Sequence, residues 1–259
     1  MDEISKHNEK IWSEWVDNQS EYTRPWIDLD PGLVRDFAAG KIDPMPRPYM
    51  YAYPQYVFSD VCGKKVLCLA TGGGQQSAVF GLLGADVTVV DLTEGQLSGD
   101  RKAAAAYGFR VTTIKADMRD LSALADDSFD LVYQAISIVF VPDTRPVYRE
   151  VARVLKPGGL YRVGHMLPNT YGAQETDWTG AGYSLKGRYR GGPVEDADAR
   201  EFRHLLPDIF TALVEAGFRI KSVHEDPRHL HPLDGAVPGT WDHMSGQIAQ
   251  YFCIVAERG

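Results

Sequence analysis

Five apolar runs alternate with helix-forming stretches between residues 65 and 167, and no other feature of the sequence limits the fold as strongly. The runs are KVLCLA (65–70), ADVTVVDL (85–92), FRVTTIKAD (109–117), SFDLVYQAISIV (128–139) and GLYRVGHML (159–167). Helix patterns at 76–83, 95–108 and 144–159 separate most of them. Strands and helices at this spacing predict βαβ units and a parallel sheet with helices on both faces. Ligands of such sheets bind outside the carboxyl ends of the strands.

The end of the chain has a different pattern. A helix pattern at 207–218 leads into RIKSVHED (219–226), and the last apolar run is YFCIVAER (251–258). No helix pattern lies between these two runs, so we expect their strands to pair antiparallel. The sequence therefore predicts an α/β fold with a doubly wound, mostly parallel sheet and an antiparallel last strand.

Residues 1–60 differ from the rest because they are rich in aromatic residues and proline. The sequence predicts a helix over 3–16 and a second one within DPGLVRDFAAG (30–40), with Asp30 as its N-cap. The prolines between 44 and 54 exclude regular structure there. We expect this segment to be a helical cap packed on the core.

The remaining chain, residues 61–259, is predicted to form one α/β domain. Two of its stretches, 167–202 and 227–249, lack the periodicity of strands and helices. Long irregular loops in a compact domain are often functional. We interpret both as insertions that contact the substrate.

Charge and apolar pattern argue against several function classes. The formal net charge is −8, which gives no general attraction to nucleic acid. No run of about 18 apolar residues occurs, so we expect no membrane span. The three cysteines are scattered, metal-ligand spacings are missing, and the charged N-terminus has no signal-peptide pattern. We therefore predict a cytoplasmic protein without a metal site.

Three glycines follow the first apolar run, in VLCLATGGGQQSA (66–78). A phosphate-binding P-loop needs a lysine after its glycines, and none is present. The dinucleotide fingerprint is nearly matched by Gly72, Gly74 and Ser77, which by itself is weak evidence. The glycines also fit a flexible turn, or a loop whose N–H groups bind the carboxylate tail of another cofactor.

Acids stand at the ends of the next two runs. Asp91 can accept both hydroxyls of a ribose, which dinucleotides and adenosyl compounds share; the structural alternative is a cap for the following helix. Asp117 ends the third run, where the edge of an adenine would lie. Three neighbouring strand ends that each carry a suitable residue indicate a cofactor site more specifically than any one of them alone.

Together these segments resemble the motif series of class I S-adenosylmethionine-dependent methyltransferases of the small-molecule type. The series is VLCLATGGG, VTVVDLTEGQL, IKADMRDL, SFDLVYQAISIVFVPD and REVARVLKPGGLYRV. It covers residues 60–166, and the helix and strand pair at 207–258 are similar to the C-terminal end of the family. The resemblance implies a Rossmann-like sheet of seven strands, methyltransferase activity and S-adenosyl-L-methionine as cofactor, with S-adenosyl-L-homocysteine as product.

The resemblance also implies a role for each matching position. Residues 70–73 should line the methionine part of the cofactor, Asp91 should bind the ribose, and Asp117 should accept from the adenine amino group. Gln134 and Ala135 should border the sulfonium and the acceptor. The full set of implied cofactor contacts is Tyr22, Ala70, Thr71, Gly72, Gly73, Asp91, Leu92, Gln96, Asp117, Met118, Gln134 and Ala135.

Two positions depart from the family pattern. The family usually has an acid where Cys68 stands and a glycine where Ala70 stands. That acid commonly helps to orient the loop and the amino group of the cofactor. Gln75 and Gln76 follow the glycines, and we expect their amides to compensate for its loss.

His165 is the candidate general base, because it stands near the end of the fifth run and that strand end should face the cofactor. The alternative is a histidine satisfied by a neighbouring loop. Tyr22 is a candidate cover for the cofactor, since an N-terminal aromatic segment closes the site in similar enzymes. The alternative for Tyr22 is that it joins Trp12 and Trp15 on the inner face of a helix.

The predicted function is in-line transfer of a methyl group to a small molecule. Aromatic residues are frequent in the cap and in both insertions, which favours an aromatic or heterocyclic acceptor over nucleic acid or protein. The alternative is a non-catalytic protein of the same fold that binds S-adenosylmethionine or S-adenosylhomocysteine. Only the altered residues 68–70 favour this alternative.

Overall fold

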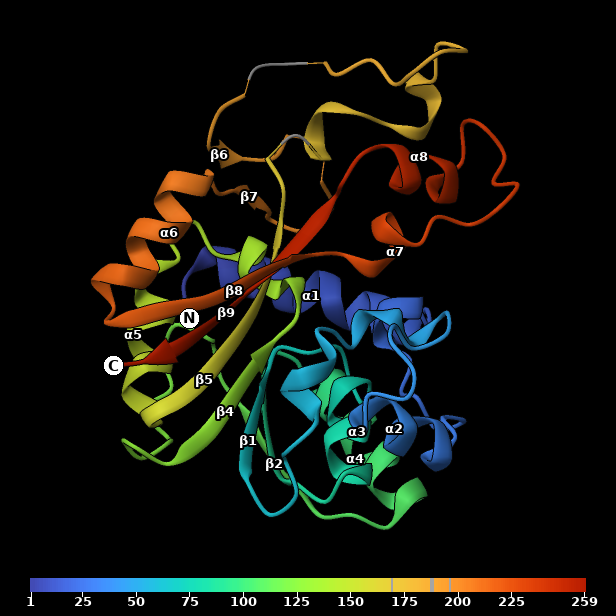
Figure 1. Ribbon diagram of the computed structural model, residues 1–259. Coiled ribbons are helices and arrows are strands. Elements are labelled where there is room, and N and C mark those ends of the chain that lie inside the picture. Colours follow the sequence, from blue (N-terminus) through green and yellow to red (C-terminus); the bar gives the residue numbers. More distant parts are fainter. Residues whose placement is uncertain (169, 187–188, 196) are drawn as a thin grey trace.

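The computed structural model describes residues 1–168, 170–186, 189–195 and 197–259. Within them, seven strands form one sheet in the order β3–β2–β1–β4–β5–β9–β8 (Figure 1). Neighbours from β3 to β5 pair in parallel, and β9 is antiparallel to β5 and β8, which confirms the predicted sheet. The strands are β1 (Lys65–Leu69), β2 (Asp86–Asp91), β3 (Val111–Lys115), β4 (Phe129–Gln134), β5 (Leu155–Met166), β8 (Phe218–Glu225) and β9 (Tyr251–Arg258).

Helices cover both faces of the sheet, α2, α3 and α4 on one and α5 and α6 on the other (Figure 1). Alternate residues of β1 enter two separate apolar clusters, Cys68 on the side of α3 and Leu69 on the side of α5. Both faces are therefore buried, which is why the strands are almost continuously apolar. The helices are α2 (Pro31–Ala38), α3 (Gln76–Leu82), α4 (Glu94–Tyr107), α5 (Arg145–Val154) and α6 (Leu206–Glu215).

The carboxyl ends of β1, β2 and β4 lie side by side. Leu69 is opposite Val90 of β2 and Gln134 of β4. Asp91 is opposite Lys115, the last residue of β3. The segments that follow these strands therefore leave the sheet at one edge, as the cofactor prediction requires.

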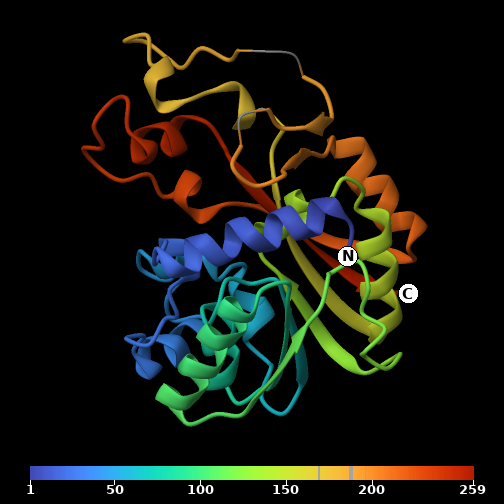
Figure 2. The ribbon, with the colours of Figure 1, turned by 180° about the vertical axis from the view of Figure 1, so that it is seen from behind.

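The N-terminal helix α1 (Glu3–Asp17) crosses this carboxyl edge (Figure 2). Its Asn8 side chain donates to the carbonyls of Phe140 and Arg200. Trp12 packs edge-on against the ring of Phe140, with the centroids 5.4 Å apart. The helix thus ties the turn after β4 to the first insertion.

The two insertions contact each other beyond the carboxyl edge (Figure 1). Tyr183 pairs with Nδ1 of His243 at 2.9 Å, and the His243 ring packs edge-on against Trp178. Positions 169, 187, 188 and 196 of the first insertion lie outside the described residues. The elements of the insertions are the 3₁₀ turns Thr170–Gly172 and Glu175–Asp177, the strands β6 (Gly192–Pro193) and β7 (Phe202–Arg203), and the helices α7 (Pro227–Leu230) and α8 (Trp241–Gln247).

Two predicted stretches differ in part from the structure. The fourth strand ends at Gln134, where Gln134 and Ala135 were expected to end it, and the rest of the run at 128–139 lies in the 3₁₀ turn Ile136–Phe140. A short run of β-branched residues is buried equally well in a turn, so periodicity could not locate this end. The stretch 227–249 is not wholly irregular, since it holds α7 and α8.

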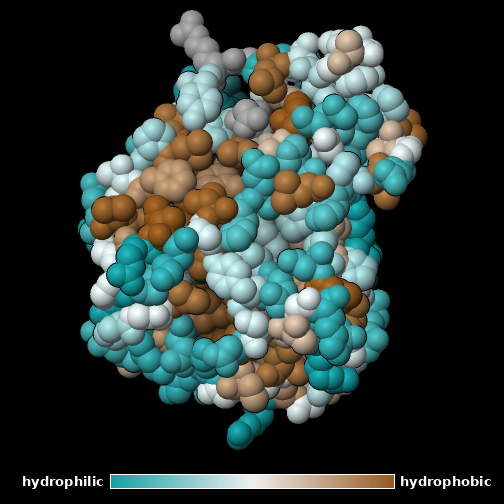
Figure 3. Space-filling view, in the orientation of Figure 1, coloured by the Kyte–Doolittle hydropathy of each residue, from teal (hydrophilic) through white to brown (hydrophobic). Residues whose placement is uncertain are grey.

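Strand β8 forms one edge of the sheet. Apolar side chains gather on the side of the molecule where α6 and β8 lie (Figure 3), and Val214 and Val223 are largely exposed. Arg219 and Lys221 of β8 pair with Glu257 of β9, and such charges discourage pairing with another strand. Among the described residues, no helix is both long and apolar enough to cross a bilayer.

Candidate functional site

The glycine loop, residues 70–75 after β1, has a backbone conformation that residues other than glycine rarely adopt. Gly72, Gly73 and Gly74 have φ angles of 86°, 61° and 93°. A Cβ atom on Gly73 would lie 2.3 Å from Oε1 of Gln96. Conformation and close approach both require glycine here.

The N-terminal segment lies directly on this loop. Nε2 of Gln75 donates to the carbonyls of Glu21 and Arg24, at 2.9 and 3.2 Å. The carbonyl of Tyr22 lies 3.0 Å from where a Cβ atom on Gly72 would be. The Gln75 amide, which we expected to compensate for the missing acid, therefore binds the N-terminal segment instead.

Tyr22 lies beyond the end of α1, so it is not part of the inner face of that helix. Its ring is about half exposed. Partial burial and the neighbouring Tyr51 and Glu21 raise the pKa of Tyr22 to about 12. Its hydroxyl is therefore protonated at neutral pH and can donate a hydrogen bond.

Asp91 is buried at the end of β2. Its Oδ1 accepts from the N–H of Thr93 at 2.9 Å and from the Thr93 hydroxyl at 3.1 Å. Thr93 is the N-cap of α4, so the capping alternative describes part of what Asp91 does. Burial raises the pKa of Asp91 to about 6.

Asp100 is a site residue that the sequence motifs did not predict. It lies on α4 with no exposed surface, and its Oδ1 accepts from the N–H of Gly74 at 2.8 Å and from the hydroxyl of Ser77. Burial is the main reason why the pKa of Asp100 rises to about 7. An acid on the buried side of a helix is the signal that could have revealed it.

Asp117 follows β3 and is held by the N-terminal helix. Its Oδ1 accepts from the backbone N–H and Nε of Arg119, and its Oδ2 accepts from Nη2 of Arg119 and the hydroxyl of Ser5. Arg119 also pairs with Asp2. Burial opposes ionisation of Asp117, but these bonds outweigh it and the pKa lies below its usual value. Each carboxylate oxygen thus already has two donors.

Three further predicted positions join β4 to its neighbours. Gln134 is fully buried; its Oε1 accepts from the Tyr161 hydroxyl, and its Nε2 contacts Sδ of Met118 at 3.3 Å. The carbonyl of Ala135 accepts from the N–H of Gly164 at 3.1 Å. These contacts position the end of β4 at the carboxyl edge. Leu92, after β2, is partly buried.

His165 points into the core. Its side chain is only 1% exposed, its ring stacks on Phe252, and its Nε2 pairs with the Tyr148 hydroxyl at 3.2 Å. Burial lowers the pKa of His165 well below its usual value. This placement favours the alternative of a histidine with a structural hydrogen bond, although the partner, Tyr148, belongs to helix α5 and not to a loop. The role as general base stays a prediction.

The two departures from the family pattern have different local surroundings. Ala70 has a φ angle of 49°, in the left-handed region where glycine is preferred. Cys68 is fully buried; burial raises the pKa of its thiol well above the usual value, and the charge of Asp100 adds to this.

Several buried polar atoms around the glycine loop have no hydrogen-bond partner within the described residues. They are Oγ1 of Thr71, Oε1 of Gln76, Oε1 of Gln96 and Oδ2 of Asp100. Buried polar groups normally have partners, so a cluster of exceptions needs an explanation. Acceptors beside a bare loop and Asp91 fit a ligand with ammonium and hydroxyl donors, such as S-adenosylmethionine.

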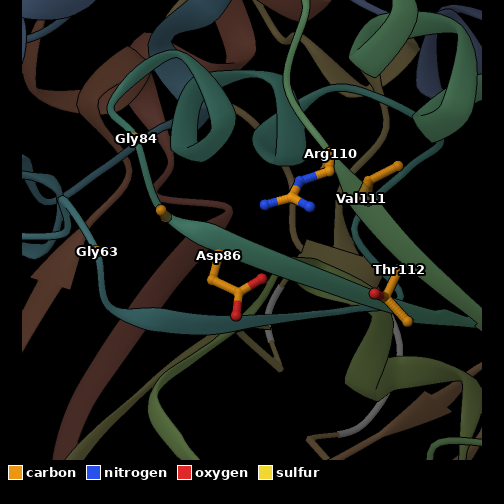
Figure 4. Close-up of a pocket in the computed structure, with 7 residues that line it drawn as sticks. Gly63, Gly84, Asp86, Arg110, Val111 and Thr112 are labelled. Carbon is orange, nitrogen blue, oxygen red and sulfur yellow. The ribbon is translucent and has the colours of Figure 1, made fainter.

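Figure 4 shows a hollow at the opposite edge of the sheet, where β2 and β3 begin. Its lining residues are Gly63, Gly84, Ala85, Asp86, Arg110, Val111 and Thr112. The amino ends of parallel strands are not where ligands of α/β sheets bind. No group of three or more metal-ligating side chains occurs among the described residues.

Comparison with known proteins identifies the family. A family model described as a methyltransferase domain matches residues 67–163. An uncharacterized methyltransferase of Bacillus subtilis (strain 168), YbaJ, is 34% identical over 240 residues, which are 87% of this chain and 92% of that protein. The chain belongs to the class I S-adenosylmethionine-dependent methyltransferases.

Two other proteins are similar to this methyltransferase over different lengths. An S-adenosylmethionine-dependent methyltransferase from Mesorhizobium loti has the same fold, with a TM-score of 0.64 and 24% identity, over 82% of this chain and 96% of that one. Demethylmenaquinone methyltransferase of Clavibacter sepedonicus is 40% identical over 99 residues, 38% of this chain and 40% of that protein.

Proposed function

We propose that this methyltransferase methylates a small aromatic or heterocyclic molecule, with S-adenosyl-L-methionine as donor. The observation that carries the proposal is the cluster of buried oxygens around the glycine loop, beside Asp91, that have no hydrogen-bond partner in the described part of the chain. When bound, S-adenosyl-L-methionine supplies a methyl group on a sulfonium, which a nucleophile can displace in line.

The chain would hold the cofactor with Asp91 and with buried oxygens that have no hydrogen-bond partner among the described residues. Asp91, fixed by Thr93, would accept from the ribose hydroxyls. Gln96 would support the ribose side and Thr71 the methionine part, because each has a buried oxygen without a partner in the described part of the chain. Each such atom that gains a donor adds about 1 kcal/mol to binding. Gly72 would allow the backbone to approach closely.

Aromatic side chains support the proposed acceptor class. The Arg228 guanidinium lies between the rings of Tyr51 and Tyr251, 4.3 and 5.1 Å from their centroids, and pairs with Asp226. Tyr22 itself lies against the glycine loop, since its carbonyl would be 3.0 Å from a Cβ atom on Gly72. Flat acceptors are bound well by such rings.

The chain contributes to the transfer mainly by positioning. Alignment of two reacting groups can supply a large part of a rate enhancement, and a base is needed only for acceptors that lose a proton. His165 would require a rearrangement or a relay through Tyr148 to reach an acceptor. A base role predicts that His165→Asn lowers kcat and removes a pH-dependent limb, whereas a packing role predicts a lower Tm alone.

The test combines binding and turnover. Isothermal titration with S-adenosylhomocysteine should give a clear Kd for the wild type, and incubation with S-adenosylmethionine and a panel of phenols and heterocycles should release S-adenosylhomocysteine. Binding without turnover on any acceptor would favour the non-catalytic alternative. No binding would contradict the proposal. Mass spectrometry of a co-purified ligand would identify the acceptor class directly.

We also propose that residues 1–60 act as a cap on this site. The cap touches the glycine loop through Gln75, Asp117 through Ser5, and the turn after β4 through Asn8. These contacts support a segment that closes over the cofactor.

A further inference from the structure

The glycine loop lacks the acid that usually supports it in this family. Cys68 occupies that position in β1, fully buried in the apolar cluster on the side of α3. A thiol whose pKa is raised by burial is neutral at pH 7 and supplies no negative charge. Another group must provide that charge if the loop is to keep the same electrostatics.

Helix α4 places such a group under the loop. Gly99 packs so closely on the loop that a Cβ atom on it would lie 2.3 Å from the carbonyl oxygen of Gly73, and one on Gly74 would lie 2.5 Å from the carbonyl oxygen of Gly99. The next residue is Asp100, whose Oδ1 accepts from Gly74 and Ser77. The carboxylate thus links the loop to the start of α3.

Asp100 has no cationic partner in the described part of the chain. Arg101 directs its guanidinium to Glu94 and Thr113 at the surface. Oδ2 of Asp100 is buried and accepts no hydrogen bond from any residue that the structure describes. A buried carboxylate that bonds only neutral donors is costly, so stability alone does not explain it.

We propose that Asp100 is the positioning residue that replaces the missing acid of β1. It holds the glycine loop through Gly74 and Ser77, and it places beneath the loop the negative charge that attracts the ammonium group of the cofactor's methionine part. This role rests on the proposed function, because it assumes that the cofactor binds at this loop.

The test moves the acid back to the strand. Isothermal titration with S-adenosylhomocysteine compares the wild type, Asp100→Asn and the double variant Cys68→Asp/Asp100→Asn. We expect Asp100→Asn to weaken binding at least about tenfold, near 1.4 kcal/mol, and the double variant to recover most of the loss. The control Glu94→Gln removes an exposed acid from the same helix and should leave the Kd unchanged.

A structural readout separates positioning from folding. The Tm of each variant without ligand, measured at pH 8, should not fall in Asp100→Asn, because the variant removes an unpaired buried charge. A Kd within about threefold of the wild type would overturn the assigned role. So would a loss that a stably folded double variant does not recover, since an acid at position 68 could then not take over the role assigned to Asp100. Failure of the wild type to bind would overturn the proposed function as well, which distinguishes the two.

Discussion

Asp100 and Asp117 lie at the same edge of the sheet but in opposite electrostatic surroundings. Asp100 bonds two neutral donors, is fully buried, and has a pKa raised to about 7. Asp117 bonds Arg119 and Ser5 with both oxygens, and its pKa is lowered. The carboxyl groups beside the glycine loop therefore have no bonded cation within the described residues, whereas Asp117 is already paired with Arg119.

The difference indicates where a cationic ligand would gain the most favourable electrostatic interaction. A positive group near Asp91 and Asp100 would gain an interaction that the protein does not provide, as the methionine ammonium and the sulfonium of the proposed cofactor would. A donor arriving at Asp117 must compete with Ser5 and Arg119. Asp117 therefore serves the closure of α1 in this structure, and its adenine contact stays a prediction.

The largest expected effect is the loss of cofactor affinity when Asp91 is replaced. Asp91→Ala removes the acceptor proposed for two ribose hydroxyls, and two charged hydrogen bonds correspond to a loss of roughly 100-fold in affinity. Isothermal titration with S-adenosylhomocysteine measures it. Asp86→Ala, an exposed acid at the start of the same strand, is the matched control. Tight binding by Asp91→Ala would contradict the site.

The second effect is on stability. The folded-state pKa of Asp100 lies at about 7, above its unfolded value near 3.8, so folding binds the proton more tightly. The free energy of unfolding therefore falls as pH rises from about 4 to about 7 and stays reduced above that. Asp100→Asn should be more stable than the wild type by about 1–3 kcal/mol at pH 8 and equally stable near pH 4.

Urea unfolding at both pH values checks this expectation. Cys68, Asp91 and Arg101 are the ionisable groups that act on Asp100, and they are unchanged in the variant. An equal loss of stability at both pH values would mean that the two hydrogen bonds of Asp100 outweigh its burial, which would remove the contrast with Asp117.

A smaller effect is expected at Asp117. Its lowered pKa means that Asp117 adds stability above its unfolded pKa, and that this contribution is lost as pH falls through the folded value. Asp117→Asn should weaken cofactor binding about three- to tenfold, less than Asp91→Ala, because Arg119 and Ser5 already occupy the carboxylate. It should also speed amide exchange in α1. An effect on affinity larger than that of Asp91→Ala would reverse the comparison.

The smallest expected change in stability and affinity is that of a substitution at Ala70. Its φ angle of 49° is unfavourable for alanine, but glycine costs more entropy on folding. Ala70→Gly should therefore stabilise the protein by only about 0.5 kcal/mol and leave the Kd within about twofold. Thermal unfolding at neutral pH measures the first quantity. A clear loss of affinity would show that the alanine methyl contacts the cofactor.

Much of the architecture followed from local patterns. The strand at 65–70, the helix capped by Asp30 and the antiparallel pair at 218–258 each depend on a few neighbouring residues, and the structure has them close to the predicted bounds. The apolar run at 128–139 extends beyond the end of β4, because residues 137–139 bury their side chains in a turn. Burial alone does not distinguish a turn from a strand when the run is short.

The sequence by itself determined the sheet, the row of strand ends and the family. These depend on periodicity and on motifs in contiguous segments. Only the tertiary structure decided which side chain serves each position: Gln75 holds the cap, His165 faces Tyr148, and Asp100 supports the loop in place of Cys68. Such contacts join residues far apart in the chain, and their energies depend on burial and distance, which no local pattern contains.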